Sequence, residues 1–301
     1  MALRILTTVN YSAGENAPGD SGLMFTTGLI ASLVEYDPSL HFYVLVPNDH
    51  YHAWSALLPS KRVTPIPLPM APRLHGGDFQ FEPTAIYNAF DFKRFDIDVL
   101  FLNQLETVPA FLQFLNRHMF HNVPAVSYVH WFDTRRPSTP KQRLHFPALL
   151  AALAGMEAST AIGCNSAFGR DKVLLAAGRW FNQATLSSLA ERMVVLPPGV
   201  SVREIIAQRS CRKRGRARAI VSHRLLKYTG VRHLLVATLP RLLRNRCDLE
   251  VLVTNPTRVR LPRGITELPR LRVATLSRAD YIKALWESDI VIAPHRATHW
   301  S

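Results

Sequence analysis

The sequence predicts an α/β protein made of two doubly wound domains, the second of them incomplete. Three observations support this prediction. Short apolar or β-branched runs alternate with segments of helical spacing, as in parallel α/β sheets. A proline-marked basic stretch interrupts the alternation, which then resumes. The 301 residues are 48% hydrophobic and 19% charged, which excludes a disordered chain and fits two domains.

The first 200 residues are expected to form one complete domain. Its predicted strands are Arg4–Val9, His41–Val46, Arg62–Ile66, Asp98–Leu102, Ala125–His130, Thr160–Gly163 and Met193–Leu196. Its predicted helices are Gly22–Glu35, Pro109–Arg117, Arg143–Ala154 and Ala167–Ala177. Runs that are apolar along their whole length, such as Val99–Leu102, suit strands buried on both faces of a parallel sheet.

Two interruptions break this pattern. Pro65–Pro72 holds too many prolines for regular structure, so we expect a long surface loop there. Residues 201–216 follow Pro197-Pro198-Gly199, contain most of the Arg- and Lys-rich run 212–218, and end where a new strand begins. We interpret 201–216 as a basic linker between domains 1–200 and 217–301.

The segment 217–301 resumes the α/β pattern. We expect strands at Arg218–Ser222, Leu249–Thr254, Arg272–Leu276 and Asp289–Ala293, and helices at Val231–Leu243 and Ala279–Glu287. Ser301 comes soon after the last strand, whereas a doubly wound domain normally has a further strand or two with their helices. The sequence therefore predicts a truncated second domain.

The net charge of +14 is unevenly distributed. Residues 1–200 hold 15 basic and 15 acidic side chains, so all the excess lies in the last third. No apolar run is long enough to span a bilayer, and Met1–Asn10 does not resemble a secretory signal. Three scattered cysteines indicate a reducing compartment rather than disulfides or structural zinc. We expect a cytoplasmic protein.

Ligands of open parallel sheets bind beyond the carboxyl ends of the strands, which directs attention to the loops there. The loop after the first strand holds Gly14, Gly19 and Gly22 before a helix, an arrangement that lets backbone N–H groups approach a phosphate or sugar oxygen. The spacing fits neither the dinucleotide fingerprint nor a Walker A loop. A surface loop with Ser21 capping the helix explains the same residues equally well.

Three further loops carry candidate side chains. His130 ends a predicted strand and suits a sugar or acid–base contact, although a lone histidine more often bonds a backbone carbonyl. Arg224 and Lys227 lie between a strand and a helix and suit a diphosphate; the alternative is a basic loop on a basic domain. His295 and His299 have no nearby Asp, Glu or Cys to complete a metal site, so we predict none.

The order of these features resembles a glycosyltransferase of family 4, which has the GT-B fold of two Rossmann-like domains facing each other across a cleft. No single motif is specific, and the resemblance rests on order and spacing over nearly 300 residues. The matching stretches are Gly19-Asp20-Ser21-Gly22, Tyr128-Val129-His130, Asn165-Ser166-Ala167-Phe168, Val195-Leu196-Pro197-Pro198-Gly199-Val200, Arg224 with Gly230 six residues on, and Ser288-Asp289-Ile290-Val291-Ile292-Ala293-Pro294.

The resemblance implies transfer of a sugar from a UDP- or GDP-linked donor to an acceptor, with retention, without a metal and without a further cofactor. It implies that the C-terminal domain binds the nucleotide. The implied roles are catalysis for His130, donor diphosphate binding for Arg224, Lys227 and Gly230, an acceptor and phosphate loop for Gly19, Asp20, Ser21 and Gly22, base contacts for Leu276 and Ser277, and a donor-sugar loop with His295 and Thr298.

The sequence departs from the family pattern at two places. The family's lysine falls on Thr229, which leaves Lys227 as the nearest cation. The first acidic residue of the family's Glu-x7-Glu element falls on Thr298, and the second falls beyond Ser301. Two alternatives stay open: a protein that binds or modifies nucleic acid with its basic C-terminal third, and an inactive fragment that binds nucleotide. A nucleic-acid acceptor would unite the first alternative with the enzyme.

Overall fold

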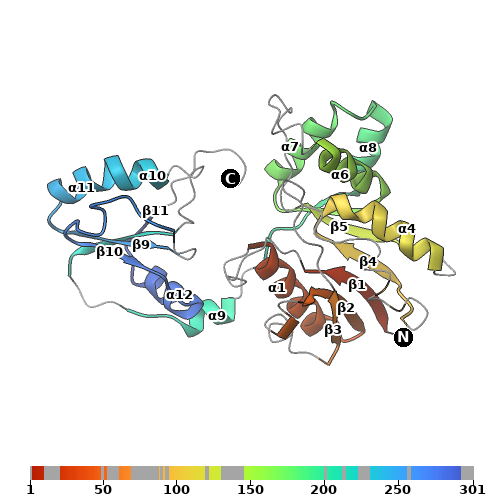
Figure 1. Cartoon of the computed structure of the whole chain (residues 1–301), viewed down its shortest axis with the longest axis horizontal. Coiled ribbons are helices and arrows are strands. Elements are labelled where there is room, and N and C mark those ends of the chain that lie inside the picture. The colour runs from red at the N-terminus through yellow and green to blue at the C-terminus, as the bar shows by residue number, and fades with distance from the viewer. Residues whose placement is uncertain are drawn as a thin grey trace. The chain divides into compact units, whose positions relative to one another are not determined.

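The computed structural model describes residues 2–9, 21–48, 51–52, 61–68, 88, 91, 95–118, 122–129, 146–199, 202–211, 215–222, 231–255 and 259–292. The chain divides into two compact units, Met1–Gly199 and Val200–Ser301, and each contains one parallel sheet (Figure 1). The predicted α/β class is confirmed.

The N-terminal unit is a seven-stranded sheet in the order β3-β2-β1-β4-β5-β6-β7. Every neighbouring pair of strands in it is parallel. The strands are β1 (Leu3–Thr8), β2 (Leu40–Pro47), β3 (Val63–Leu68), β4 (Val99–Leu102), β5 (Ala125–Val129), β6 (Ala161–Cys164) and β7 (Met193–Val195). The helices are α1 (Ser21–Tyr36), the 3-10 turn η3 (Leu105–Thr107), α4 (Val108–His118), α6 (Phe146–Ala158), α7 (Ala167–Ala177) and α8 (Gln183–Arg192).

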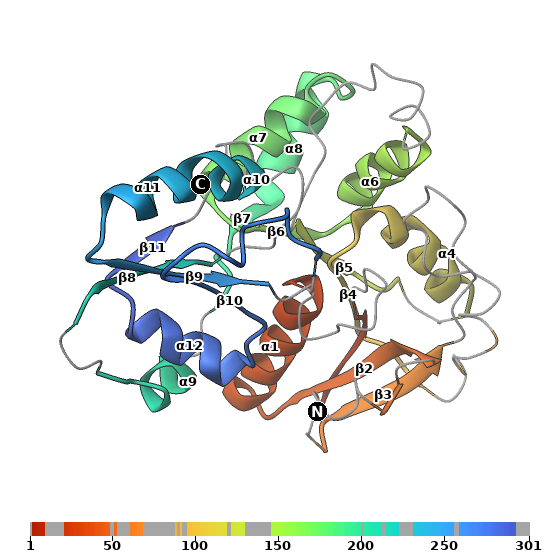
Figure 2. The ribbon, with the colours of Figure 1, turned by 60° about the vertical axis from the view of Figure 1, so that its left-hand side comes forward.

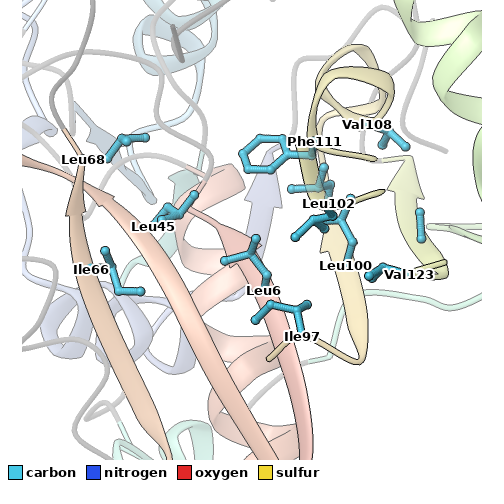
Figure 3. Packing of buried hydrophobic residues seen from close by; sticks show 12 residues of the cluster. Leu6, Leu45, Ile66, Leu68, Ile97, Leu100, Leu102, Val108, Phe111 and Val123 are labelled. Atoms are coloured by element: carbon cyan, nitrogen blue, oxygen red, sulfur yellow. The ribbon is translucent and has the colours of Figure 1, made fainter. Parts of the chain in front are cut away.

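Alternate residues of the central strands enter two different cores, one on each face of the sheet. Leu6, Leu45 and Leu100 pack with Phe111 of α4 on one face, and Figure 3 shows their side chains gathered there. Ile5, Val44 and other residues of β1 to β3 pack against α1 on the opposite face. Burial on both faces explains why these strands are apolar along their whole length.

The predicted loop at Pro65–Pro72 is wrong for its first residues, because β3 continues to Leu68. Phe42 N donates a hydrogen bond to Arg62 O at 2.9 Å. The backbone N–H and C=O groups of even-numbered residues of β3 therefore point toward β2, and those of odd-numbered residues point away from it. Pro65 and Pro67 therefore place their missing N–H groups on the outer edge of the described sheet, the position that tolerates proline. Residues 69–72 lie outside the described ranges.

The C-terminal unit is a four-stranded parallel sheet in the order β10-β9-β8-β11. Its strands are β8 (Ala217–Val221), β9 (Leu249–Thr254), β10 (Leu271–Ala274) and β11 (Ile290–Ile292). Its helices are α9 (Val202–Ala207), α10 (Val231–His233), the π-helix η5 (Leu234–Thr238), α11 (Leu239–Asn245) and α12 (Arg278–Trp286). Of these, α10, η5 and α11 form one continuous helical segment.

The expected linker 201–216 contains the helix α9, which lies in the C-terminal unit. Two contacts attach α9 to α12: Arg278 Nη2 donates to Glu204 Oε2 at 2.8 Å, and Trp286 Nε1 donates to Ile205 O at 2.8 Å. This part of the connector is therefore held by side chains far along the chain, which local sequence does not indicate.

Candidate functional site

Both sheets have a topological switch point, which is a pair of adjacent strands whose onward connections lead toward opposite edges of the sheet. In the N-terminal unit the chain runs from β1 outward through β2 and β3, then returns to β4 on the other side of β1. The C-terminal unit repeats this order with β8, β9, β10 and then β11, as Figure 2 shows. Ligands of open α/β sheets bind beyond the carboxyl ends of the two strands at such a point.

The carboxyl ends of β1 and β4 carry buried polar side chains that sequence analysis missed. Thr8 is fully buried at the end of β1, and Asn103 and Gln104, directly after β4, are also buried. Asn103 Nδ2 donates to Thr26 Oγ1 of α1 at 2.5 Å. Among the described residues, Thr8 Oγ1 and Asn103 Oδ1 have no hydrogen-bond partner. The change from apolar to polar residues at the strand ends was the available signal.

Thr8 and Asn103 belong to opposite faces of the sheet. Thr7 is paired with Phe101, and alternation along β1 puts Thr8 on the face of Leu6 and α4. Asn103 lies on the face of α1, as its bond to Thr26 requires. The two neutral side chains therefore flank the carboxyl edge from both sides.

Tyr128, the first residue of the predicted motif that ends at His130, has a structural role. Its ring stacks on Phe25 of α1 with centroids 4.3 Å apart, and its hydroxyl donates to Leu196 O at 2.9 Å. Gly163 makes room for the ring, because a Cβ there would lie 2.7 Å from Tyr128 Cδ2. Burial, with a smaller contribution from Cys164, raises the pKa of Tyr128 to about 12, so the hydroxyl remains a donor at neutral pH.

The motif beginning at Asn165 opens a helix as predicted. Ser166 is the N-cap of α7, and its Oγ accepts a hydrogen bond from Gly169 N at 3.0 Å. The acceptor-side loop is described only at its end: α1 begins at Ser21, so Ser21 and Gly22 form its first turn rather than preceding it.

The carboxyl end of the C-terminal sheet is fixed by side-chain hydrogen bonds. Thr254 Oγ1 at the end of β9 donates to Val221 O of β8 at 2.9 Å. Asn255 closes the next loop, with Nδ2 donating to Val259 O and Oδ1 accepting from Val259 N. Thr275 Oγ1, after β10, donates to Asn255 O at 2.9 Å. Three adjacent strand ends are thus held in fixed relative positions.

Leu276 and Ser277, the predicted base contacts, follow β10 at this edge. Leu276 is half-buried and Ser277 is exposed. Ser277 caps α12: its Oγ accepts from Asp280 N at 3.1 Å and donates to Asp280 Oδ2 at 2.6 Å. The side chain of Ser277 is therefore engaged in the helix cap.

The other predicted site residues lie outside the described residues, and the chain order alone relates each of them to a strand. They are Gly19 and Asp20 after β1, His130 after β5, Arg224, Lys227 and Gly230 after β8, and His295 and Thr298 after β11.

Two further features bear on the candidate chemistry. In the described part of the chain, no group of three or more His, Cys, Asp or Glu side chains is arranged to hold a metal ion. No helix within the same residues is long and apolar enough to cross a membrane.

Comparison with known proteins identifies the fold. No family model and no curated protein matches the sequence. Among solved structures, the apo structure of OtsA matches with a TM-score of 0.61 and 13% identity, over 100% of this chain and 80% of that chain. The glycotransferase of kitacinnamycin matches with a TM-score of 0.54 and 13% identity, over 97% and 75%. UGT89C1 of Arabidopsis thaliana in complex with UDP matches with a TM-score of 0.52 and 13% identity, over 92% and 71%.

Identities this low establish the fold alone, so family 4 stays a prediction. The similarity covers both units and agrees with the repeated strand order of their sheets. The chain therefore adopts the GT-B fold of glycosyltransferases, built from two Rossmann-like units.

Proposed function

We propose that the protein is a glycosyltransferase that moves a sugar from a UDP- or GDP-sugar to an acceptor. The observation that carries the proposal is the strand order of the C-terminal sheet. The predicted diphosphate residues follow β8 in the chain, the predicted donor-sugar residues follow β11, and β8 and β11 are the neighbours at the switch point. Retention of configuration and independence of metals and cofactors are part of the same proposal.

The proposed chemistry depends on fixed positive charge. Departure of a nucleoside diphosphate builds negative charge on the phosphate oxygens, and guanidinium and ammonium groups already in position stabilise it. Arg224 and Lys227 would supply these groups, with Gly230 before the helix that begins at Val231. Leu276 and Ser277 would contact the base, and His295 and Thr298 the donor sugar.

The N-terminal unit would bind the acceptor. His130 would face the transferred sugar or the acceptor, and Gly19, Asp20, Ser21 and Gly22 would line the acceptor side near the phosphates. The buried side chains Thr8 and Asn103 are neutral, so the described part of this edge suits hydroxyl groups better than charged ones.

Donor binding tests the proposal directly. The thermal shift of the whole chain is measured with UDP-, GDP- and ADP-glucose, and Kd follows from calorimetry with the donor that gives a shift. Arg224→Ala should raise this Kd at least tenfold, because a charge-assisted diphosphate contact is lost. Arg272→Ala is the matched control, since it removes an exposed arginine of β10 from the same unit.

Turnover separates the roles of the two units. His130→Ala should lower sugar transfer or donor hydrolysis and leave the donor Kd unchanged. Two results would contradict the proposal. One is a chain whose melting temperature is changed by none of the nucleotide-sugars, and the other is an Arg224→Ala variant that binds the donor as tightly as wild type.

A further inference from the structure

The sheet of the C-terminal unit is covered by two different layers. The helical segment α10–η5–α11 lies over one face, and α9 and α12 lie over the other (Figures 1 and 2). The loop 259–270 belongs to the first layer, because Ile265 shares a core with Leu235, Leu239 and Leu243 of the helical segment. We call residues 231–248 and 259–270 the arginine layer.

The two layers differ in charge. The arginine layer contains two acidic residues, Asp248 and Glu267, and seven arginines: Arg232, Arg241, Arg244, Arg246, Arg260, Arg263 and Arg270. The segments 202–211 and 278–289, which form the opposite layer, contain four basic and four acidic residues. The described residues of this unit contain 14 basic side chains, and half of them therefore belong to the arginine layer.

Carboxylates of the opposite layer are largely engaged. Arg278 pairs with Glu204, and Glu287 accepts from Arg218 at 3.1 Å and from Ser210 at 2.9 Å. Asp280 is bonded within the cap of α12. The charges of this layer therefore largely cancel one another.

The arginine layer is only partly neutralised. Arg246 pairs with Asp248 at 2.7 Å. Arg244 Nε donates to Pro240 O, which leaves both Nη groups for another partner, and Arg270 Nη2 donates to Leu243 O at the end of α11. Arg241, Arg260 and Arg263 are exposed and make no ion pair with any described residue.

The composition of the arginine layer favours one kind of polyanion. Guanidinium groups bind phosphate oxygens through paired hydrogen bonds. Membrane-surface helices add large apolar or aromatic residues, whereas Val236 is the only large hydrophobic residue of the described layer that is exposed. Single-strand binders stack bases on aromatic rings, and residues 231–248 and 259–270 contain no Phe, Tyr or Trp.

We infer that the arginine layer binds the phosphate backbone of double-stranded nucleic acid. The contact reads no base sequence, because it consists of side-chain contacts to phosphates. The arginine layer covers a face of the sheet, whereas the donor is proposed to bind at the carboxyl ends of its strands. Either proposal can therefore fail without the other.

The test is the salt dependence of binding to a duplex DNA of about two helical turns, followed by fluorescence anisotropy with the full chain. Each phosphate contact contributes about 0.9 to the slope of log Kd against log salt. The double variant Arg241→Gln/Arg244→Gln should therefore lower this slope by about two and raise Kd at about 0.1 M salt more than tenfold. The control Arg209→Gln/Lys283→Gln removes the same charge from the opposite layer and should change both quantities much less.

Thermal unfolding of both double variants checks that the fold is retained, since all four side chains are exposed. Three results would overturn the inference: no duplex binding by the wild type, an equal loss in the two double variants, or binding confined to vesicles containing anionic phosphatidylserine.

Discussion

The two units align their first and fourth strands with the same pair of hydrogen bonds between an arginine and an aspartate. In the N-terminal unit, Arg4 N donates to Asp98 Oδ2 at 2.8 Å and Asp98 N donates to Arg4 O at 2.9 Å. In the C-terminal unit, Arg218 N donates to Asp289 Oδ2 at 2.8 Å and Asp289 N donates to Arg218 O at 2.9 Å. An aspartate before the fourth strand thus fixes the register of both sheets at the amino end of the switch point.

The units differ in what surrounds this arginine–aspartate pair. The Arg4 guanidinium bonds Asp98 itself and Asp96, whereas Arg218 turns to Glu287 and Glu250. β4 is an interior strand, and Leu100 is fully buried. β11 is the edge strand of the sheet that the described residues form, and Val291, at the equivalent register position, is 53% exposed. The register of the two strands is therefore set by one arginine–aspartate pair in each unit, whereas the burial of the fourth strand depends on whether further strands cover it.

Leu100 and Val291 give the largest expected difference between the units. Leu100→Ala should destabilise the N-terminal unit by about 2–5 kcal/mol, because it leaves a cavity in a packed core. Val291→Ala should cost the C-terminal unit about 0.5 kcal/mol or less, because its side chain already contacts solvent. Hydrogen exchange, read peptide by peptide, reports each unit separately. Equal losses in the two units would mean that β11 is covered as β4 is.

Removal of the two aspartates compares how much the arginine–aspartate hydrogen bonds stabilise each unit. Asp98→Ala should cost about 2–3 kcal/mol, because the acceptor of the Arg4 N–H is lost together with one of the two carboxylates that bind the Arg4 guanidinium. Asp289→Ala should cost about 1 kcal/mol, since Arg218 keeps Glu287 and Glu250. Asn at either position should recover part of the loss by accepting from the arginine N–H. Denaturant unfolding with exchange of the β1 and β8 peptides measures both, and a larger loss for Asp289→Ala would contradict the account.

Both units also place an arginine at the end of a helix. Arg192 Nη1 donates to carbonyls at the end of α6, namely those of Met156, Glu157 and Ser159, and Arg270 reaches one carbonyl of α11. Positive groups stabilise this end of a helix. Arg192→Ala should therefore cost about 1.5 kcal/mol and Arg270→Ala about half as much. Thermal unfolding checks the order, with Arg170→Ala, which removes a half-buried guanidinium paired with the adjacent Asp171, as a control of little effect.

The smallest expected effect concerns acid. The hydrogen bond from Arg278 lowers the pKa of Glu204 below its ordinary value of 4.5. The contribution of this pair to stability is therefore complete above the ordinary value and is lost as the pH falls through the lowered one. Because the pair is largely solvated, we expect about 0.5 kcal/mol or less.

Trp286 reports on this pair, because its Nε1 donates to Ile205 O of α9. Its fluorescence, isolated by subtracting Trp286→Phe, should change in the wild type as the pH falls below the ordinary glutamate pKa of 4.5. In Glu204→Gln this change should vanish. A signal with the same pH dependence in both would show that Glu204 does not attach α9.

Most of the fold is predictable from the sequence because buried parallel strands leave a strong local pattern. The patterns at Leu249–Thr254 and Ala167–Ala177 predict β9 and α7 with the bounds that the structure has. The end of β3, Pro67–Leu68, lies beyond the predicted strand because the tolerance of proline there depends on being at a sheet edge, which only the topology reveals.

Two helices and the polar edge show where local patterns stop short. The helix α8 is absent from the predicted elements although Asn182 caps it by accepting from Thr185 N, a signal that the sequence does contain. The helix α9 is short and depends on Arg278 and Trp286, about 80 residues away. Thr8 and Asn103 are 95 positions apart and become neighbours of one edge only because β1 pairs with β4.

Hydrogen exchange of the whole chain with and without a saturating nucleotide-sugar tests most directly whether the C-terminal unit holds the donor. We expect slower exchange in peptides spanning the carboxyl ends of β8 and β10, with no change at the amino ends of the same strands. Arg224→Ala should abolish this protection. Protection confined to the N-terminal unit, or protection that survives Arg224→Ala unchanged, would contradict the account.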